Sequence, residues 1–266
     1  MFDAGNALML PAFLLFIKMT NAQIKLIKSL KDKKYRNQHG LFVVEGRKTV
    51  EELLKSDFQT VNVYAVEAWQ TDELKQQLGD KLITVTQSEL ERISNQTTPE
   101  GVIATVRQNK NTAIASDDNL ILALDNINNP GNLGTIIRLA VWFGIKDIVC
   151  NQNTVDCYNP KVLQSTMGAI FHVNLLYTDL AEFLKERQNG PVYGTVLQNG
   201  KNIYKENLTD SGIIIIGNES HGISGEILKY INRPVTVPSF ACAGGAESLN
   251  ASVACGIILS EFRRRQ

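Results

Sequence analysis

The stretch NLILALDNINNPGNLGTIIRLAVWFG, residues 119–144, decides the fold of this chain. An apolar run at its start predicts a buried strand, a turn rich in asparagine surrounds Pro130-Gly131, and an apolar helix follows that ends at Gly144. A second apolar run, GIIIIGN at 212–218, is rich in β-branched residues and is typical of a strand buried on both faces of a parallel sheet. These stretches predict an α/β domain with a mostly parallel sheet.

The same alternation of strands and helices extends to both ends of the chain. Downstream, further strands are expected at 147–150, 173–176, 191–196 and 234–238, and helices at 159–170, 178–188, 224–231 and 247–265. Upstream, strands are expected at 41–44, 61–66, 82–85 and 101–106, and helices at 45–56, 71–78 and 86–94, with a helix start at Thr20 or Asn21. The polar stretch 107–119 predicts a linker. We therefore expect two α/β domains, residues 19–108 and 117–266.

Composition agrees with a globular chain of about two domains. Of 266 residues 44% are hydrophobic and 20% are charged, and 27 basic residues balance 27 acidic ones, which argues against a histone-like polycation. The charge is uneven, because residues 18–48 hold nine bases against Asp32 and Glu45, a local net charge of +7. That segment is either a solvated helix face or a footprint for an RNA phosphate backbone, with Tyr35 compatible with base stacking.

The cysteines and the N-terminus bear on location. Cys150, Cys157, Cys242 and Cys255 form no C-x-x-C pair and only three histidines are present, so we expect no zinc site, and a reducing, cytoplasmic location. The apolar run 7–17 is too short to span a bilayer and lacks the basic start of a signal peptide, so we expect no membrane segment. We expect Met19 to be the natural first residue, with 1–18 an upstream extension.

Polar residues gather in three turns of the second domain, each after an expected buried strand, where open parallel sheets bind ligands. The first turn, DNINNPGNLG at 125–134, leads into a helix that carries Asn132 and Arg138. It suits polar or anionic ligands, since it exposes peptide N–H groups and amides at a helix start. Arg138 is either a functional cation or a surface arginine whose stem lies along the apolar helix.

The second and third turns offer a carboxylate, a hydroxyl and an amide. Glu219 comes directly off the strand at 212–218 and is either a helix-start stabiliser or a functional group, while the neighbouring His221 is expected to be a surface residue. Ser248 and Asn250 stand near the start of the last helix, where such residues are usually caps. Just upstream, Gly244-Gly245 lets the backbone approach a ligand closely.

The sequence lacks the motifs of other nucleotide-binding proteins and of hydrolases. GNLG lacks the G-x-G-x-x-G spacing, which weakens a nucleotide-dependent dehydrogenase as an alternative. GTVLQNGKN at 194–202 has five residues between its glycines where a P-loop has four, and Asn202 stands where a P-loop holds its metal. There is no G-x-S-x-G elbow and no H-E-x-x-H helix.

The three turns together resemble a known family. NPGNLGTIIRLA (129–140), IIIIGNESHGIS (213–224) and VPSFACAGGAESLNAS (237–252) are similar, in order and spacing, to the three motifs of the SpoU (TrmH-type) RNA ribose methyltransferases of the SPOUT superfamily. LFVVEGRKTVEELL (41–54) and TTPEGVIATV (97–106) resemble the RNA-binding domain that precedes the catalytic domain in many members. The resemblance implies an α/β catalytic domain with a trefoil knot, S-adenosylmethionine as methyl donor, a ribose 2′-hydroxyl of rRNA or tRNA as acceptor, homodimers and no metal.

Positions carry over residue by residue. Asn132 and Arg138 occupy the polar and catalytic positions of the first motif, Glu219 matches the acid of the second, and Ser248 and Asn250 match the pair of the third. The backbone around Gly217, Val237 and Leu249 is implied to hold the adenosyl group, with Thr195 in the loop after the preceding strand. The third motif is longer here than in the family, because ACAGGA separates its two halves.

The implied reaction needs a proton acceptor. Family proposals give that role to Arg138, but a guanidinium has a pKa above about 12 and rarely loses its proton. We expect Arg138 to clamp the substrate phosphate and Glu219 or water to take the proton. The alternative, a catalytically inactive RNA-binding module of the same fold, fits less well because the polar set of the three motifs is intact.

Overall fold

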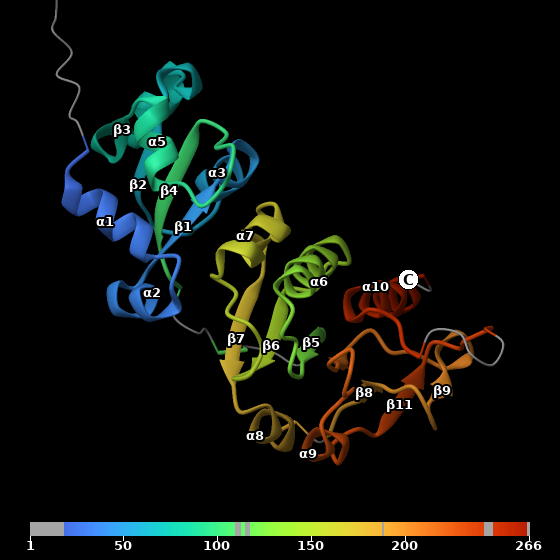
Figure 1. Cartoon of the computed structure of the whole chain (residues 1–266). Coiled ribbons are helices and arrows are strands. Elements are labelled where there is room, and N and C mark those ends of the chain that lie inside the picture. Colours follow the sequence, from blue (N-terminus) through green and yellow to red (C-terminus); the bar gives the residue numbers. More distant parts are fainter. Residues whose placement is uncertain (1–18, 110–112, 115–117, 188, 242–246, 265–266) are drawn as a thin grey trace, which may run out of the picture.

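The computed structural model describes residues 19–109, 113–114, 118–187, 189–241 and 247–264, and these residues form two sheets. The first sheet has four strands in the order β1-β4-β2-β3, in which β4 runs antiparallel to both neighbours (Figure 1). Its strands are β1 (Leu41–Glu45), β2 (Thr60–Ala65), β3 (Leu82–Thr84) and β4 (Val102–Arg107). The accompanying helices are α1 (Asn21–Ser29), α2 (Lys33–His39), α3 (Arg47–Leu54), α4 (Asp72–Leu78) and α5 (Gln87–Ile93), with the 3-10 turns η1 (Glu67–Trp69) and η2 (Gly79–Lys81).

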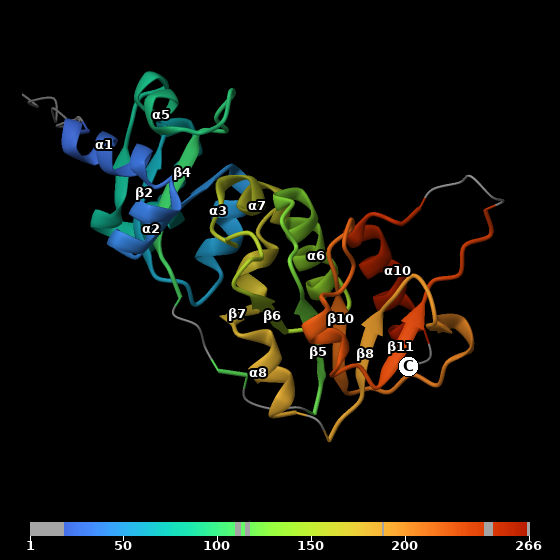
Figure 2. The same cartoon turned by 60° about the horizontal axis from the view of Figure 1, so that its bottom comes forward.

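The second sheet has seven strands in the order β7-β6-β5-β10-β8-β11-β9, and all its pairings are parallel (Figure 2). Its strands are β5 (Leu120–Leu124), β6 (Asp147–Asn151), β7 (Asn174–Thr178), β8 (Val192–Thr195), β9 (Lys201–Asn202), β10 (Gly212–Ile216) and β11 (Arg233–Thr236). Its helices are α6 (Pro130–Trp142), α7 (Pro160–Thr166), α8 (Leu180–Lys185), α9 (Gly225–Leu228) and α10 (Ala251–Arg263), with the 3-10 turns η3 (Ala169–His172) and η4 (Ile203–Lys205). The expected α/β class with a parallel sheet is confirmed.

Capping residues set most helix starts. Thr20 forms a capping box with Gln23 at α1, Thr86 does the same with Glu89 at α5, and Thr71 accepts a hydrogen bond from the Leu74 N–H at α4. These side chains satisfy N–H groups that have no partner inside the first turn. The expected starts of α1, α4 and α5 are confirmed. The helix expected at 45–56 begins at Arg47, because Glu45 still belongs to β1. Helix α2 was missed because its seven residues carry no apolar periodicity.

Three helices of the second domain differ from expectation at their ends. Helix α6 begins at Pro130, two residues before the start at Asn132 that the apolar run predicts, because the Asn129 side chain caps it by accepting from the Gly131 and Asn132 N–H groups. The helix expected at 159–170 ends at Thr166, since Met167 takes a left-handed conformation (φ 49°). The last helix begins at 251 and not at 247, because Asn250 is its cap.

Helices α6 and α7 touch through a glycine. A Cβ added to Gly134 would lie 2.4 Å from the Cβ of Ser165 and 2.9 Å from the carbonyl oxygen of Val162. Real side chains do not approach so closely, so only glycine lets the two helices meet here. This contact holds α7 directly against the helix that carries Asn132 and Arg138.

The two sheets share one apolar core. The largest cluster of buried apolar side chains includes Phe42 and Val44 from the first sheet and Ile136 and Ile170 from the second unit. Within it the Tyr158 ring stacks on Phe42, with ring centres 4.3 Å apart. The first unit is therefore packed against the second over an apolar interface, and the two are not joined by the linker alone.

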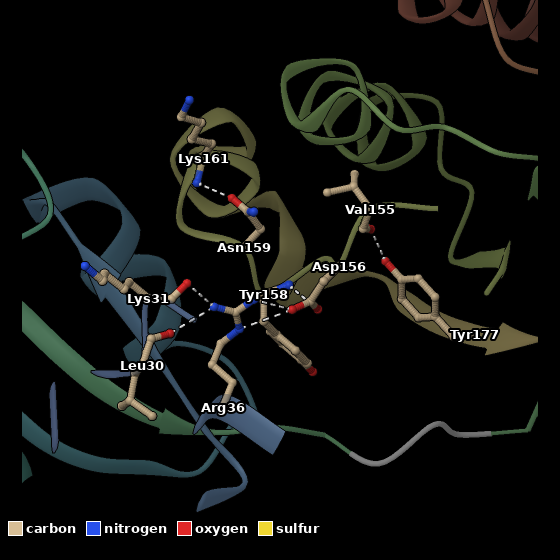
Figure 3. Close-up of polar contacts among 9 residues, drawn as sticks. All are labelled: Leu30, Lys31, Arg36, Val155, Asp156, Tyr158, Asn159, Lys161 and Tyr177. Atoms are coloured by element: carbon tan, nitrogen blue, oxygen red, sulfur yellow. Dashed lines mark hydrogen bonds and ion pairs between the residues drawn. The ribbon is translucent and has the colours of Figure 1, made fainter. Parts of the chain in front are cut away.

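A buried ion pair also joins the two units at this interface (Figure 3). The Arg36 side chain is 2% exposed and its Nη2 lies 2.5 Å from Oδ2 of Asp156, which also accepts from Nε at 3.1 Å. Its Nη1 donates to the carbonyl oxygens of Leu30 (2.9 Å) and Lys31 (2.6 Å). Removing one partner of such a pair leaves an unpaired buried charge and costs about 3–5 kcal/mol. Arg36, counted among the bases of the +7 segment, is thus engaged inside the protein.

Three expectations concern residues that the structure does not describe. Residues 1–18 and Gly244-Gly245 lie outside the described residues. The expected trefoil knot depends on a path that includes 242–246, also outside them, so the knot stays a prediction that the fold implies. Among the described helices, none has the length and apolar character to cross a membrane.

Candidate active site

Three separate segments meet at one edge of the parallel sheet. β5 leads into the turn 125–129, its neighbour β10 leads into Gly217 and the following loop, and the segment before α10 joins them. Because the carboxyl ends of parallel strands lie at the same edge, neighbouring strands bring their loops together. The three polar turns that the sequence singled out are therefore close in space.

A chain of side-chain hydrogen bonds links these three segments. Nδ2 of Asn132 donates to Oε1 of Glu219 (3.0 Å), and Nδ2 of Asn250 donates to Oδ1 of Asn132 (2.9 Å). The Ser248 hydroxyl donates to the backbone oxygen of Glu219 (3.2 Å). The structure thus brings four of the five residues predicted to be catalytic into one hydrogen-bonded network, which we call the Asn132–Glu219 network: Asn132, Glu219, Ser248 and Asn250.

Asn250 has both roles that the sequence left open. Its Oδ1 caps α10 by accepting from the N–H groups of Ser252 (2.9 Å) and Val253 (3.4 Å), while its Nδ2 reaches Asn132. The capping bonds fix the orientation of the amide, because both of its ends are engaged. The helix cap therefore aims the donor at the site.

Glu219 does not stabilise a helix start. The next helix, α9, begins at Gly225, and the acid in its first turn is Glu226. One carboxylate oxygen of Glu219 accepts from Asn132, and the other, Oε2, is buried with no hydrogen-bond partner among the residues that the structure describes. Buried polar atoms almost always have a partner. The unpaired oxygen therefore points to a group that a bound molecule supplies.

Arg138 does not join this network. It lies on α6 six residues beyond Asn132, its side chain is exposed, and no hydrogen bond or ion pair ties it to the described part of the chain. It shares the outer face of α6 with Thr135, Leu139 and Trp142, which follow the i, i+3, i+4, i+7 spacing of one helix face. Within the described part of the chain, the guanidinium is exposed and can meet a bound molecule.

The residues expected to hold the cofactor gather at the same edge of the sheet. Thr195 ends β8, Gly217 follows β10 and Val237 follows β11, and these strands are neighbours in the order β10-β8-β11. Leu249 directly precedes Asn250 and is 43% exposed. A Cβ on Gly217 would lie 2.4 Å from the carbonyl carbon of Gly222, so glycine is needed where the loop 217–222 folds back on itself.

A second polar network, which the sequence did not predict, lies at the same edge of the sheet. The buried Asp125 carboxylate accepts from the side-chain amides of Asn126 (2.9 Å) and Asn151 (2.8 Å) and from the Ser224 N–H (2.7 Å). Nδ2 of Asn218 donates to the carbonyl oxygen of Asn126 (2.9 Å). These bonds tie the end of β6 to the loops after β5 and β10. The available signal was a polar residue at or just beyond the end of each apolar strand.

Thiol chemistry is not part of this site. Cys150, Cys157 and Cys255 are buried free thiols, and burial raises the pKa of each, that of Cys255 to about 12. They stay protonated at neutral pH and are poor nucleophiles. Cys242 lies outside the described residues. Within the described ranges, no group of three His, Cys, Asp or Glu side chains is placed to hold a metal ion.

Similarity to known proteins shows the family of this chain. Residues 119–260 match the model of the SpoU rRNA methylase family. The chain belongs to this family. Residues 21–104 match an MRM3-like substrate binding domain. The resemblance that the three motifs predicted is confirmed, and so is the class of enzyme, a methyltransferase.

Relatives of known name cover nearly the whole chain. The chain is 29% identical over 245 residues to the 23S rRNA (guanosine(2553)-2′-O)-methyltransferase RlmP of Bacillus subtilis, covering 91% of this chain and 96% of that protein. It is 28% identical to the 23S rRNA (guanosine-2′-O-)-methyltransferase RlmB of Neisseria meningitidis, covering 85% and 87% of the two chains.

Two solved structures are similar over more than nine-tenths of the chain. A TrmH-family protein from Porphyromonas gingivalis has a TM-score of 0.82 at 33% identity, covering 93% of this chain and 99% of that one. An AdoMet-bound rRNA methyltransferase from Sinorhizobium meliloti has a TM-score of 0.82 at 26% identity, covering 93% and 96%. Family members of this fold therefore share both units with this chain.

Proposed function

We propose that this protein transfers a methyl group from S-adenosylmethionine to a ribose 2′-hydroxyl of ribosomal RNA. The observation that carries the proposal is the Asn132–Glu219 network, which ends in a buried carboxylate oxygen without a partner among the described residues. Residues 19–108 bind the RNA and residues 117–266 transfer the methyl group. The protein acts in the cytoplasm, in agreement with three reduced, buried cysteines.

The residues present fit the methyl donor. Thr195, Gly217 and Val237 stand at the ends of three adjacent parallel strands, the edge at which open parallel sheets bind ligands. The closely folded loop at Gly217 brings backbone and not a side chain to that edge. When bound, S-adenosylmethionine supplies a methyl group already activated by its sulfonium, so no metal is required.

The chain's own residues position the hydroxyl and accept its proton. The Asn132 amide holds one oxygen of the Glu219 carboxylate, and the Asn250 amide in turn holds Asn132, which leaves Oε2 to accept the proton of the ribose hydroxyl. Arg138 grips the adjacent phosphate with its planar fork and polarises the hydroxyl. Holding reactants in line in this way can lower a barrier by about 7–11 kcal/mol in favourable cases.

A transfer assay with mapping tests this function. The purified protein, labelled S-adenosylmethionine and total RNA from cells that lack the protein should yield one ribosomal position that gains a 2′-O-methyl group, and the same position should be unmethylated in those cells. Binding of RNA without transfer would identify an inactive RNA-binding module. A methyl group found on a base would refute the ribose assignment.

A second copy of the chain completes the site in this proposal. A groove of about 550 Å³ runs between α6 and α10, lined by apolar and small residues that include Leu139, Val253 and Ile257. Trp142 is 82% exposed on the same face of α6 as Arg138. An exposed tryptophan beside an apolar groove is typical of a protein interface. A homodimer over this face places the partner's surface next to Arg138, close to the reaction.

Replacing Trp142 with glutamate should therefore break the dimer. Buried interface tryptophans are often hot spots worth about 2 kcal/mol or more, so the dimer dissociation constant should rise by about 30-fold. Sedimentation velocity over a range of protein concentrations measures it. Leu228→Glu, at a 45% exposed position on α9, is the control and should leave the dimer intact. A wild-type protein that stays monomeric at all concentrations contradicts the homodimer.

The basic segment of the first unit is the proposed RNA-docking surface. Its exposed cations are Lys25, Lys28, Lys31, Lys33, Lys34, Arg47 and Lys48. Lys25 and Lys28 are three residues apart on α1 and so share a helix face. The expected partner is a phosphate backbone, since neutralising it releases counterions.

Reversing two of these charges should weaken RNA binding in a salt-dependent way. In a Lys25→Glu/Lys28→Glu variant, the slope of log K against log salt should fall by about 0.7–0.9 for each phosphate that the variant no longer neutralises. Filter binding across a salt series measures the slope, and the affinity for S-adenosylmethionine should stay unchanged. Lys229→Glu, an exposed position near α9, is the control. An unaltered slope in the double variant would show that α1 is only a solvated face.

A further inference from the structure

A cleft of about 150 Å³ lies between the two units, in a place that the methyl-transfer chemistry does not use. One wall comes from β1, α3 and the loop after α5, and the other from α7. We propose that this cleft holds one unpaired nucleotide of the substrate RNA while another nucleotide of that RNA is methylated. The inference rests on the proposed function and adds to it a residue set that selects the RNA.

The lining suits a nucleobase. Val43 and Leu163, 7% and 3% exposed, form an apolar floor, while the amides of Gln96 and Gln164 stand at the rim. Unstacked bases present flat apolar faces and a polar edge of donors and acceptors, and RNA-binding proteins read such bases in single-stranded segments. Glutamine offers both a donor and an acceptor to a base edge. Lys161, exposed at the same rim, can pair with the nucleotide's phosphate.

The one carboxylate in the described lining of the cleft is already engaged. Glu45 accepts three hydrogen bonds, one from the Ser94 hydroxyl (2.5 Å) and two from the backbone N–H (2.9 Å) and side chain (2.8 Å) of Asn95. These donors offset its negative charge and fix that wall. Beside it, Arg47 and Lys48 are exposed at the start of α3. The surroundings of the cleft are therefore compatible with a phosphate.

The two walls are fixed relative to each other. The Arg36–Asp156 pair and the Tyr158–Phe42 stack join the segment before α7 to α2 and β1, as Figure 3 shows for the ion pair and for Lys161 on the nearby helix. Nε2 of His172 lies 2.9 Å from a carboxylate oxygen of Glu52 in α3, beyond the other end of α7. A cleft whose walls are held before binding loses little entropy when a ligand enters.

The cleft also lies close to the reaction. Its wall helix α7 carries Gln164, and the next residue, Ser165, touches Gly134 of α6, two positions after Asn132. Packed helices have axes about 8–10 Å apart. Helix α7 thus lies between the cleft and α6, so an RNA that reaches both the cleft and the Asn132–Glu219 network passes over α7.

Filling the cleft tests the inference. Gln164→Trp should raise the Kd for the substrate RNA by about 10-fold, and the Gln96→Ala/Gln164→Ala double variant by about 3- to 10-fold, the effect of removing one or two hydrogen bonds. Calorimetric binding of S-adenosylmethionine should remain at the wild-type value in each variant, which shows that the second unit is intact. Gln76→Trp, an exposed glutamine of α4 away from the cleft, is the matched control and should bind RNA as the wild type does.

Photo-crosslinking gives a second readout that does not depend on turnover. Total RNA from cells that lack the protein and were grown with 4-thiouridine should crosslink to peptides containing Lys161 or Gln164, and Gln164→Trp should abolish these crosslinks. RNA affinity unchanged in both variants, or crosslinks confined to α1 and α2, overturns the inference. If the wild type binds RNA with these crosslinks but transfers no methyl group, the proposed function fails while the cleft stands.

Discussion

Replacing Arg138 with lysine is expected to lower the single-turnover rate of methyl transfer by about 10²–10³-fold, the usual loss when a preorganised donor at a reacting group is removed. Lysine keeps the positive charge but not the planar fork, so it cannot hold a phosphate through two parallel hydrogen bonds. The affinity for S-adenosylmethionine should not change. Rapid-quench measurement with excess enzyme over labelled RNA gives the rate of the chemical step.

The structure makes this a test of chemistry and not of folding. Arg138 is exposed and makes no hydrogen bond or ion pair within the described ranges, so its replacement breaks no internal bond of that part of the chain. Arg92→Lys, an exposed position on α5, is the control and should keep the wild-type rate. A single-turnover rate near that of the wild type in Arg138→Lys would reject the phosphate clamp.

The same variant separates a clamp from a base. A lysine has an ordinary pKa of about 10.4, well below that of a guanidinium. If Arg138 were the proton acceptor, a lysine in its place would deprotonate more easily. The single-turnover rate of the variant should then approach that of the wild type as the pH rises. If Arg138 clamps the phosphate, the variant should transfer methyl groups more slowly than the wild type at every pH below about 10.4.

Local sequence patterns were enough to predict most of the fold. Apolar runs such as 120–124 and 212–216 identify buried strands because few other segments bury every side chain. The ends of helices were harder to predict. The left-handed Met167 ends α7 early, and nothing in its residue type indicates that conformation. Helix α2 has no apolar stripe that the sequence could reveal. It is held in place by Arg36, whose ion-pair partner Asp156 lies 120 residues away.

The part of the site that follows the ends of parallel strands could be predicted from the sequence. Parallel strands must deliver their following loops to one edge, so Asn132 and Glu219 could be placed together from the sequence, although 87 residues separate them. The Asp125 network was not predicted because its partners, Asn151 and Ser224, are 26 and 99 residues away and have no distinctive motif. A base in a cationic run is expected to be solvated, so the burial of Arg36 could not be predicted from the sequence.

The role of Glu219 can be isolated by a substitution that changes one atom. In Glu219→Gln the side-chain oxygen can still accept from Nδ2 of Asn132, so the position of the group is kept. The other terminal atom becomes an amide nitrogen, which cannot accept a proton. Positioned general bases contribute about 10²–10⁴-fold, so the single-turnover rate should fall by that factor, while RNA and S-adenosylmethionine affinities measured by calorimetry stay close to those of the wild type.

Glu247→Gln is the matched control, an exposed acid in the segment that carries Ser248, and it should leave the rate unchanged. A Glu219→Gln rate within a few-fold of the wild type would mean that water takes the proton and that Glu219 only orients Asn132. The buried Oε2, unpaired among the described residues, argues that Glu219 takes the proton, so a large fall in rate is the expected outcome. An oxygen needed only for orientation has no reason to remain without a partner, since a hydrogen bond to a neighbouring donor would stabilise the fold. An oxygen that receives a proton from the substrate must be kept free until the substrate arrives.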